Sequence, residues 1–309
     1  MTNGQKKQIK LEKRIARVSK KKPEEFSTAK AYFWRFVHPR AFCTTIRFFM
    51  AVIRNYLIRQ YAHAWHLTHV PVIHVDHPLD KRVPFLPEKV GIYFRFIDFW
   101  IEPMTMLIER YGLWKGMKFT NEWLRLLKKT YQSGGKIYGA FLSTTDRPDY
   151  KGDRLFRLIH GADPHLLCVP SLHIAIVVLC FTFYRMFFER EGFTEAEKAT
   201  WNSSLYREAV AIAESVLYIK QHSVNCIPAA FYMMTMQFPT LVTPPVIRQF
   251  IADMFKSAKP EEIAAADAEE IRAYMQARYN AYIEAGRTAA HWYEPVREWL
   301  STYATCMQS

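Results

Sequence analysis

Two short stretches of the chain combine serine and histidine in a way that suits phosphate chemistry. In CVPSLH, Pro170 fits the first turn of a helix and Ser171 is a good capping residue. His173 would then lie in the opening turn, where free N–H groups and the helix dipole favour an anion. The second stretch, SVLYIKQH, runs from Ser215 to His222 along another apolar segment. Together the two stretches predict a phosphate-binding site.

Helix geometry and a nearby arginine extend this site. If the second stretch is one continuous helix, Ser215, Tyr218, His222 and Cys226 share a face at about 3.6 residues per turn. Upstream of CVPSLH, the loop TTDRP carries Arg147, whose planar guanidinium can bind two phosphate oxygens at once. Arg147 is therefore a candidate phosphate ligand.

In this order, the motifs resemble those of the type 2 phosphatidic acid phosphatase superfamily. They are an arginine–proline loop, then PSxH, then a serine seven residues before a histidine. PSLH, YIKQHSV and DKRVPFLPEKVGIY (residues 80–93) are most similar to its inositolphosphotransferase (inositol phosphorylceramide synthase-like) branch. The similarity spans roughly residues 40–240 and leaves both ends of the chain outside.

The resemblance implies a bundle of five to six core helices of the phosphatidic acid phosphatase/haloperoxidase type. By position, His222 would attack phosphorus and form a phosphohistidine. His173 would protonate the leaving alkoxide and then activate the incoming water or alcohol. Arg147, Ser171 and Ser215 would bind the phosphate oxygens. The implied substrate is a phospholipid or another phosphorylated small molecule, and the mechanism requires no metal and no cofactor.

Three positions depart from the family pattern. Ala140 stands where the first motif usually has lysine, and Val216 where the third usually has arginine. Cys226 replaces the aspartate expected four residues after His222, which would orient the imidazole and stabilise its charged form. An alternative function is therefore a catalytically impaired protein that binds phosphate or serves as a scaffold at a membrane surface.

A second cluster of histidines suggests a different chemistry. Five of the 11 histidines fall within residues 63–77, together with two nearby aspartates: His63, His66, His69, His74, His77, Asp76 and Asp80. Imidazole and carboxylate groups can bind zinc or other transition metals. Steps of three residues spread around a helix, however, and HExxH is absent, so structural or solvent-exposed roles are favoured. A histidine-ligated metalloprotein is the second alternative.

The segments that must position these residues read as helices. Apolar residues recur at helical spacing over residues 31–69, 88–111 and 120–141, and residues 166–184 pass without a formal charge. The proline-rich segment 70–87 reads as a loop. An all-α fold is expected.

An arginine stripe distinguishes the first of these helices. Arg40, Arg47 and Arg54 are seven residues apart and so share one face. Lipid around the whole helix would disfavour that stripe, whereas an interfacial or bundle-facing helix tolerates it.

Composition divides the chain into three regions. It has 309 residues, half of them apolar, which suffices for a substantial core. Its five scattered cysteines form no CxxC and predict neither a disulfide framework nor a cysteine-ligated zinc site. We expect a basic, disordered tail over residues 1–30, a helical core over 31–256, and a C-terminal helical appendage over 257–309.

Positive charge is concentrated at the N-terminus. Residues 1–22 contain nine Lys or Arg and one Glu, and so supply eight of the thirteen net charges. No apolar segment interrupts them, so no cleavable signal peptide is expected. Residues 6–22 are expected to attract an anionic membrane surface. Nucleic acid is not expected, because no recognition module follows. The protein is expected to be membrane-associated, either integral or peripheral, with a cytoplasmic N-terminus.

Overall fold

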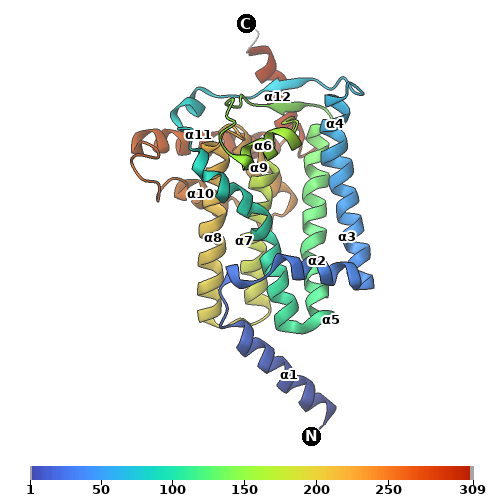
Figure 1. The fold of residues 1–309 in the computed structure, drawn as a ribbon. Coiled ribbons are helices and arrows are strands. Elements are labelled where there is room, and N and C mark those ends of the chain that lie inside the picture. The colour runs from blue at the N-terminus through green and yellow to red at the C-terminus, as the bar shows by residue number, and fades with distance from the viewer. Residues whose placement is uncertain (1, 307–309) are drawn as a thin grey trace.

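The computed structural model describes residues 2–306 and shows long helices running side by side (Figure 1). The central one is α7 (Leu172–Arg190), which packs against α5 (Val90–Tyr138), α8 (Glu195–Tyr218) and α9 (Cys226–Gln237). Most α7 side chains are buried, and their removal from water is a main source of the stability of the bundle. The expected all-α class is confirmed.

α5 consists of two antiparallel arms. They are joined at Gly112, whose φ of 79° lies in the left-handed region that favours glycine. Beyond the turn, the indole N–H of Trp123 donates to the carbonyl oxygen of Trp100 at 3.2 Å, which ties the arms together. The two arms correspond to the helices expected over 88–111 and 120–141, with a far shorter connection between them.

Three helical segments on one flank of the bundle follow one another almost without interruption. They are α3 (Pro39–Val52), the π-helical turn η2 (Ile53–Leu57) and α4 (Ile58–Ala64). They are preceded by η1 (Pro23–Glu25) and α2 (Thr28–Val37).

Short elements gather at the end of the bundle where α4 ends. They are β1 (Val72–His74), η3 (Pro78–Arg82), η4 (Pro87–Lys89), β2 (Leu142–Thr144) and α6 (Arg154–Ala162). β1 and β2 pair in parallel, so the segment 70–87, expected to be a loop, also contributes a strand.

The expected disorder of residues 1–30 is not what the structure shows. Residues 3–18 form α1 (Asn3–Val18), which projects from the end of the bundle where α5 turns (Figure 1). Its last residue, Val18, is buried, and Lys21 forms a 2.7 Å ion pair with Glu109 of α5. The basic charge therefore lies on a helix anchored to the bundle.

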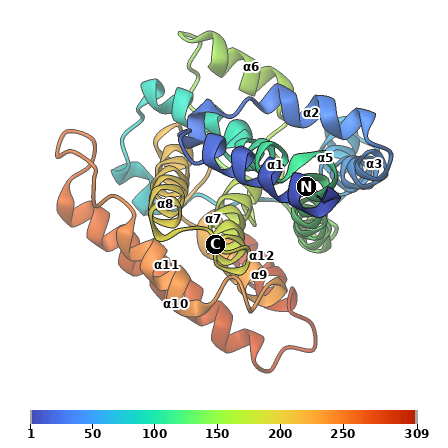
Figure 2. The same ribbon diagram turned by 90° about the horizontal axis from the view of Figure 1, so that it is seen from below.

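The C-terminal segment packs against the core on the side opposite α2 and α3 (Figure 2). It follows α10 (Pro244–Asp253) and contains α11 (Ala265–Gly286), which contacts α9, and α12 (Glu294–Cys306), which contacts β1. A division of the chain at residue 257 stays a prediction.

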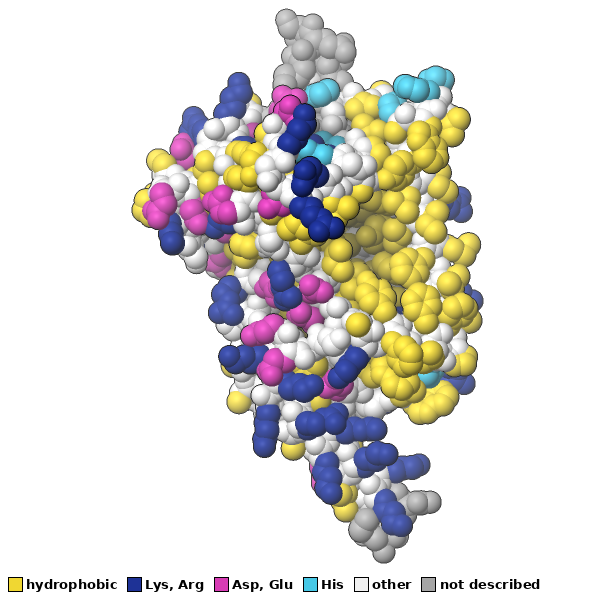
Figure 3. Space-filling view, in the orientation of Figure 1, with side chains coloured by type: hydrophobic (Ala, Val, Ile, Leu, Met, Phe, Trp, Pro, Cys, Tyr) yellow, Lys and Arg dark blue, Asp and Glu magenta, His cyan; other side chains and the backbone are white. Residues whose placement is uncertain are grey.

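By length and composition, two helical stretches could cross a membrane. They are Pro39–Ala64, which is 22% buried over its most apolar window, and Leu172–Arg190, which is 78% buried. The second is the central helix of the bundle, whereas the first exposes much of its apolar surface. Figure 3 shows that hydrophobic side chains cover one side of the molecule, whereas charged side chains crowd the other.

Candidate functional site

The N-terminus of α7 carries two of the expected site residues. Helix α7 begins directly after Ser171, whose Oγ accepts a hydrogen bond from the Ile174 N–H at 3.4 Å, as expected of a capping serine. The same Oγ lies 3.1 Å from Nε2 of His222. His173 follows in the first turn, and its Nδ1 lies 3.5 Å from Nε2 of His222. The structure thus brings both histidines and Ser171 together.

His222 lies in a loop and not on the continuous helix that the sequence predicted. α8 ends at Tyr218, and Lys220 has a φ of 56° that breaks the helix before α9 begins at Cys226. The carboxylate of Asp80 holds this loop by accepting the Val224 N–H at 2.8 Å. The prediction that Ser215, Tyr218, His222 and Cys226 share one helical face is therefore wrong.

Ser215 stays behind on α8, away from the histidines. It is buried, and its hydroxyl donates to the carbonyl oxygen of Ile212 at 2.8 Å. This contact within its own helix leaves the serine outside the cavity described below.

Arg147 lies at the edge of the site in an ionic network. Its guanidinium donates to Oδ2 of Asp163 at 2.7 Å and to Oε1 of Gln221, the residue before His222, at 2.5 Å. Burial raises the pKa of Asp163, but hydrogen bonds from His165 and the charge of Arg147 outweigh burial and lower it below its ordinary value. Arg147 is thus oriented by an ionised carboxylate beside the histidine loop.

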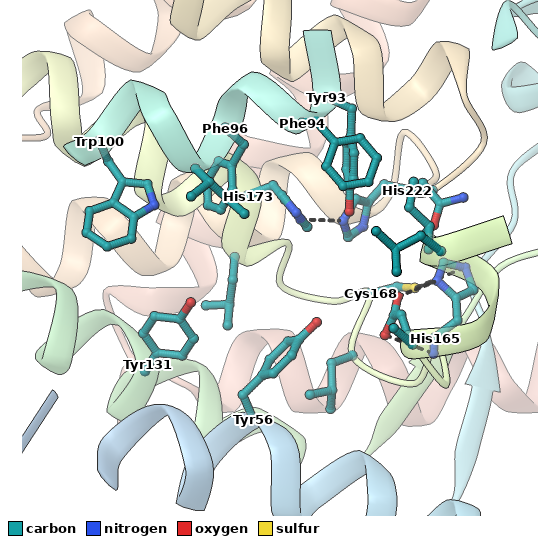
Figure 4. A pocket seen from close by; sticks show the side chains of 18 of the residues that line it. Tyr56, Tyr93, Phe94, Phe96, Trp100, Tyr131, His165, Cys168, His173 and His222 are labelled. Atoms are coloured by element: carbon teal, nitrogen blue, oxygen red, sulfur yellow. Dashed lines mark hydrogen bonds and ion pairs between the residues drawn. The ribbon is translucent and has the colours of Figure 1, made fainter. Parts of the chain in front are cut away.

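A cavity of about 530 Å³ adjoins the two histidines (Figure 4). Asp163 and Gln221, the partners of Arg147, also line it, whereas Ser171 and Arg147 themselves do not. His173 and His222 lie on one wall, and aromatic rings line much of the remainder: Tyr56, Tyr93, Phe94, Phe96, Trp100 and Tyr131. Ile97 and Leu158 line the same cavity and are 49% and 58% exposed, so it opens onto the apolar side of the molecule.

Burial makes His173 a neutral base in the empty cavity. Its ring lies between Tyr93 and Phe96, with centroid distances of 4.8 and 4.6 Å. Burial and the neighbouring charge of His222 lower the pKa of His173 to about 3. His173 can act as a general acid only when it carries a proton, so a bound anion must either supply this proton or stabilise it on the ring.

The structure adds a thiol and a third histidine that the sequence did not single out. Sγ of Cys168 lies 3.6 and 3.7 Å from the two ring nitrogens of His165 (Figure 4). His165 also contacts Thr145 Oγ1 at 2.7 Å and lies near Asp163. The sequence DPHLLC, which ends one residue before PSLH, was the available signal. A parallel bridge between Ser143 of β2 and Leu167 holds this segment beside β2.

The cluster favours a charged cysteine. Burial raises the pKa of Cys168, but hydrogen bonding with Cys226 and the charge of His165 lower it well below its ordinary value. Burial lowers the pKa of His165, but the charge of Cys168 and the hydrogen bond with Asp163 raise it to about 9. The lowered pKa of Cys168 and the raised pKa of His165 favour the charged forms of this pair at the cavity wall.

We expect Cys168 to be alkylated by iodoacetamide at a rate that is already near its plateau at pH 7, because the thiolate is the reactive form. Peptide mass spectrometry over a pH series measures this rate for each cysteine. Cys180 is the matched control, since burial raises its pKa well above its ordinary value and it does not line the cavity. A Cys168 rate that rises steeply only above pH 8 would contradict the assignment.

Cys226 leaves His222 without the expected carboxylate. Nδ1 of His222 is buried and has no hydrogen-bond partner among the residues that the structure describes. Burial and the neighbouring Cys168 raise the pKa of Cys226, so this thiol stays neutral. The closest substitute for the missing charge is Cys168, whose pKa the neighbouring His222 helps to lower.

The histidine-rich segment converges only in part. His74 and Asp76 meet Asp146, with one potential ligand atom of each within 4.8 Å of the others. His74 and Asp146 are exposed, and Asp76 already accepts the Asp146 N–H at 3.0 Å. His77 instead packs on the ring of Tyr274 at 4.1 Å. The segment thus offers one exposed three-ligand group in the described part of the chain.

No protein-family model matches the sequence, and no curated protein or solved structure matches the chain. Membership of the phosphatidic acid phosphatase superfamily therefore stays a prediction that rests on three short motifs and on the geometry around His222.

Proposed function

We propose that this protein hydrolyses or transfers the phosphate group of a lipid through a phosphohistidine on His222. One observation carries the proposal: Nε2 of His222 lies within reach of both Ser171 Oγ and His173 Nδ1 at the wall of a cavity with aromatic lining. This is the arrangement that a nucleophile and a neighbouring acid–base group require.

The proposed reaction has two steps. In the first, Nε2 of His222 attacks phosphorus and the P–O bond to the leaving group breaks. His173 passes to the departing alkoxide a proton that it takes from the bound monoester monoanion. In the second, water or an alcohol gives a proton to His173 and attacks phosphorus, and the N–P bond breaks. Ser171 donates to a phosphate oxygen or to His222, and Arg147 stabilises the charge on the equatorial oxygens.

The surroundings of the cavity favour a lipid substrate. Its aromatic walls suit acyl chains, and its mouth lies on the apolar side of the molecule shown in Figure 3. That surface includes exposed residues of α2, α3 and α4, such as Phe33, Phe36, Met50 and Ile58. An apolar surface of this extent marks an interaction site, and we assign it to the acyl region of a membrane.

Membrane contact is proposed for one side only. Other parts of the surface carry ion pairs such as Lys198–Glu189 at 2.8 Å, which lipid would desolvate at high cost. The basic residues of α1 add attraction to anionic headgroups, at roughly 1 kcal/mol for each residue near the surface.

The proposal is tested with purified protein and a panel of short-chain phospholipids, by measuring phosphate release and transfer to acceptor lipids. We expect turnover of at least one phosphate ester, and we expect turnover to survive EDTA because no metal takes part. Absence of both release and transfer across the panel would overturn the catalytic proposal.

The same assay has a predicted pH dependence. Because His173 is neutral when the cavity is empty, a phosphate monoester must bring the proton as its monoanion. That species disappears as the pH rises through about 6, the second pKa of a phosphate monoester. We therefore expect kcat/KM for a monoester to fall above about pH 6, and a rate that rises from pH 6 to 8 would contradict this proton source.

The second candidate function is phosphate binding without turnover, as a scaffold at a membrane. The unpartnered Nδ1 of His222 favours it, because a neutral cysteine at position 226 stabilises an imidazolium poorly. Saturable vanadate binding by a protein that releases no phosphate would support this candidate, and robust turnover would exclude it.

A further inference from the structure

A second hollow, of about 690 Å³, lies between α3 and the second arm of α5. Its lining residues belong to the first part of α3 and to the part of α5 just beyond the turn at Gly112. Figure 1 shows the turn of α5 at the end of the bundle opposite the start of α7. None of the residues that line the hollow lines the first cavity. The hollow is therefore separate from the candidate catalytic site.

Four cationic side chains line this hollow, and none of its lining residues is acidic. These cations are Arg40, Arg47, Lys118 and Arg125. All four are exposed, and in the described part of the chain none of them forms an ion pair or a side-chain hydrogen bond. Nearby cations behave differently, since Arg190 pairs with Glu122 and Lys115 with Glu191. Like charges gathered without a counterion repel one another, so the hollow favours an anion.

A buried histidine gives independent evidence for a missing acceptor. His38 lines the hollow and is 5% exposed. Its Nδ1 accepts the Ala41 N–H at 3.3 Å, so the neutral ring carries its proton on Nε2. That Nε2 is buried and has no partner among the described residues. A buried donor without an acceptor is costly. The ring of His38 packs edge-on against Trp114, which also lines the hollow, at a centroid distance of 4.7 Å.

The start of α3 adds a favourable field. His38 caps this helix of 14 residues, and its first turn contains no acidic residue. The helix dipole favours negative charge there, yet Arg40 occupies the first turn instead. An anion bound between the helix start and Arg40 would interact favourably with both.

Apolar residues beside the hollow identify the kind of anion. Phe36 and Val37 directly precede His38 and are 48% and 53% exposed. Trp114 lines the hollow and is 71% exposed, an arrangement typical of an aromatic residue at a membrane interface. We propose that this hollow binds the phosphate-bearing headgroup of an anionic phospholipid, whose acyl chains lie along the apolar surface of α2 and α3.

The experiment uses the full chain with His222→Ala, so that lipid is not consumed, and follows tryptophan fluorescence during titration with dioctanoyl phosphatidic acid. The signal of the hollow is the part that disappears when Trp114→Phe is added. We expect this signal to saturate with phosphatidic acid and phosphatidylglycerol but not with phosphatidylcholine. Inorganic phosphate that binds as tightly as these lipids would overturn the lipid assignment.

Neutralising variants test the cations. Arg47→Gln with Arg125→Gln should weaken binding roughly 30-fold, from about fivefold for each basic residue. The melting temperature should stay the same or rise, because neither arginine has a partner to lose. The matched control is Arg185→Gln with Arg207→Gln on α7 and α8, which removes the same charge outside the hollow. Equal weakening by both pairs, or no Trp114 signal at all, would overturn the site.

Discussion

Replacing His222 by alanine is expected to lower the rate of phosphate release or transfer by at least about 10³-fold. The expectation follows from the position of Nε2, which faces Ser171 and His173 and has no other partner in the described chain. Removing the nucleophile removes the covalent step itself, so binding of the lipid should change far less than kcat. Acid-labile phosphate on the protein, measured after rapid quenching with labelled substrate, should vanish in the variant.

Ser215→Ala is the matched control for this prediction. Sequence similarity assigns Ser215 to the phosphate, but its hydroxyl donates to Ile212 of its own helix. We therefore expect Ser215→Ala to keep most of the activity, and Ser171→Ala to lose about 10- to 10³-fold through the lost contacts with His222 and phosphate. Full activity in His222→Ala would exclude the phosphohistidine mechanism, whatever the serine variants do.

Cys226→Asp is expected to raise kcat by at least about 10-fold. Removal of the corresponding carboxylate in serine protease triads costs about 10⁴-fold, which sets an upper bound on the gain. The new carboxylate would lie at the start of α9, where the helix dipole favours it, four residues after His222. It would stabilise the positive charge that His222 acquires when it is phosphorylated.

Two further variants, Cys168→Ser and Cys226→Asn, test whether the effect of Cys226→Asp is electrostatic. A carboxylate beside a thiolate is repelled, so Cys168→Ser should increase the gain from Cys226→Asp. Cys226→Asn has nearly the same shape without the charge and should give no increase in kcat. Equal rates for the Asp and Asn variants, with melting temperatures that show both to be folded, would contradict an electrostatic role for position 226.

Local sequence signals predicted the elements that carry them. The start of α7 at CVPSLH, its capping by Ser171 and the two arms of α5 all follow from capping residues and helical periodicity. Disorder was expected for the N-terminal residues, but a capped helix and the buried Val18 stabilise residues 3–18. The partners that anchor this region lie on α5. Partners so distant in the chain cannot be inferred from local composition.

The sequence indicated which residues lie near His222 better than it indicated how they are arranged. Ser171, His173 and His222 lie together and Arg147 contacts Gln221 beside them, but the helix assumed to carry His222 is broken at Lys220. That break depends on Asp80, which lies 144 residues before Val224 and holds its N–H. No periodicity within the segment reveals such a distant support.

The loop that carries His222 is also held by the end of the chain, and this has a consequence for biosynthesis. Asn225 receives a hydrogen bond from the hydroxyl of Tyr274 and donates one to Tyr303, which follow it by 49 and 78 residues. At translation speeds of about 5–20 residues per second, Tyr303 emerges roughly 4–16 s after Asn225. The histidine loop therefore acquires its final supports only after residue 303 has been synthesised, so we expect it to be among the last parts of the protein to reach its native geometry.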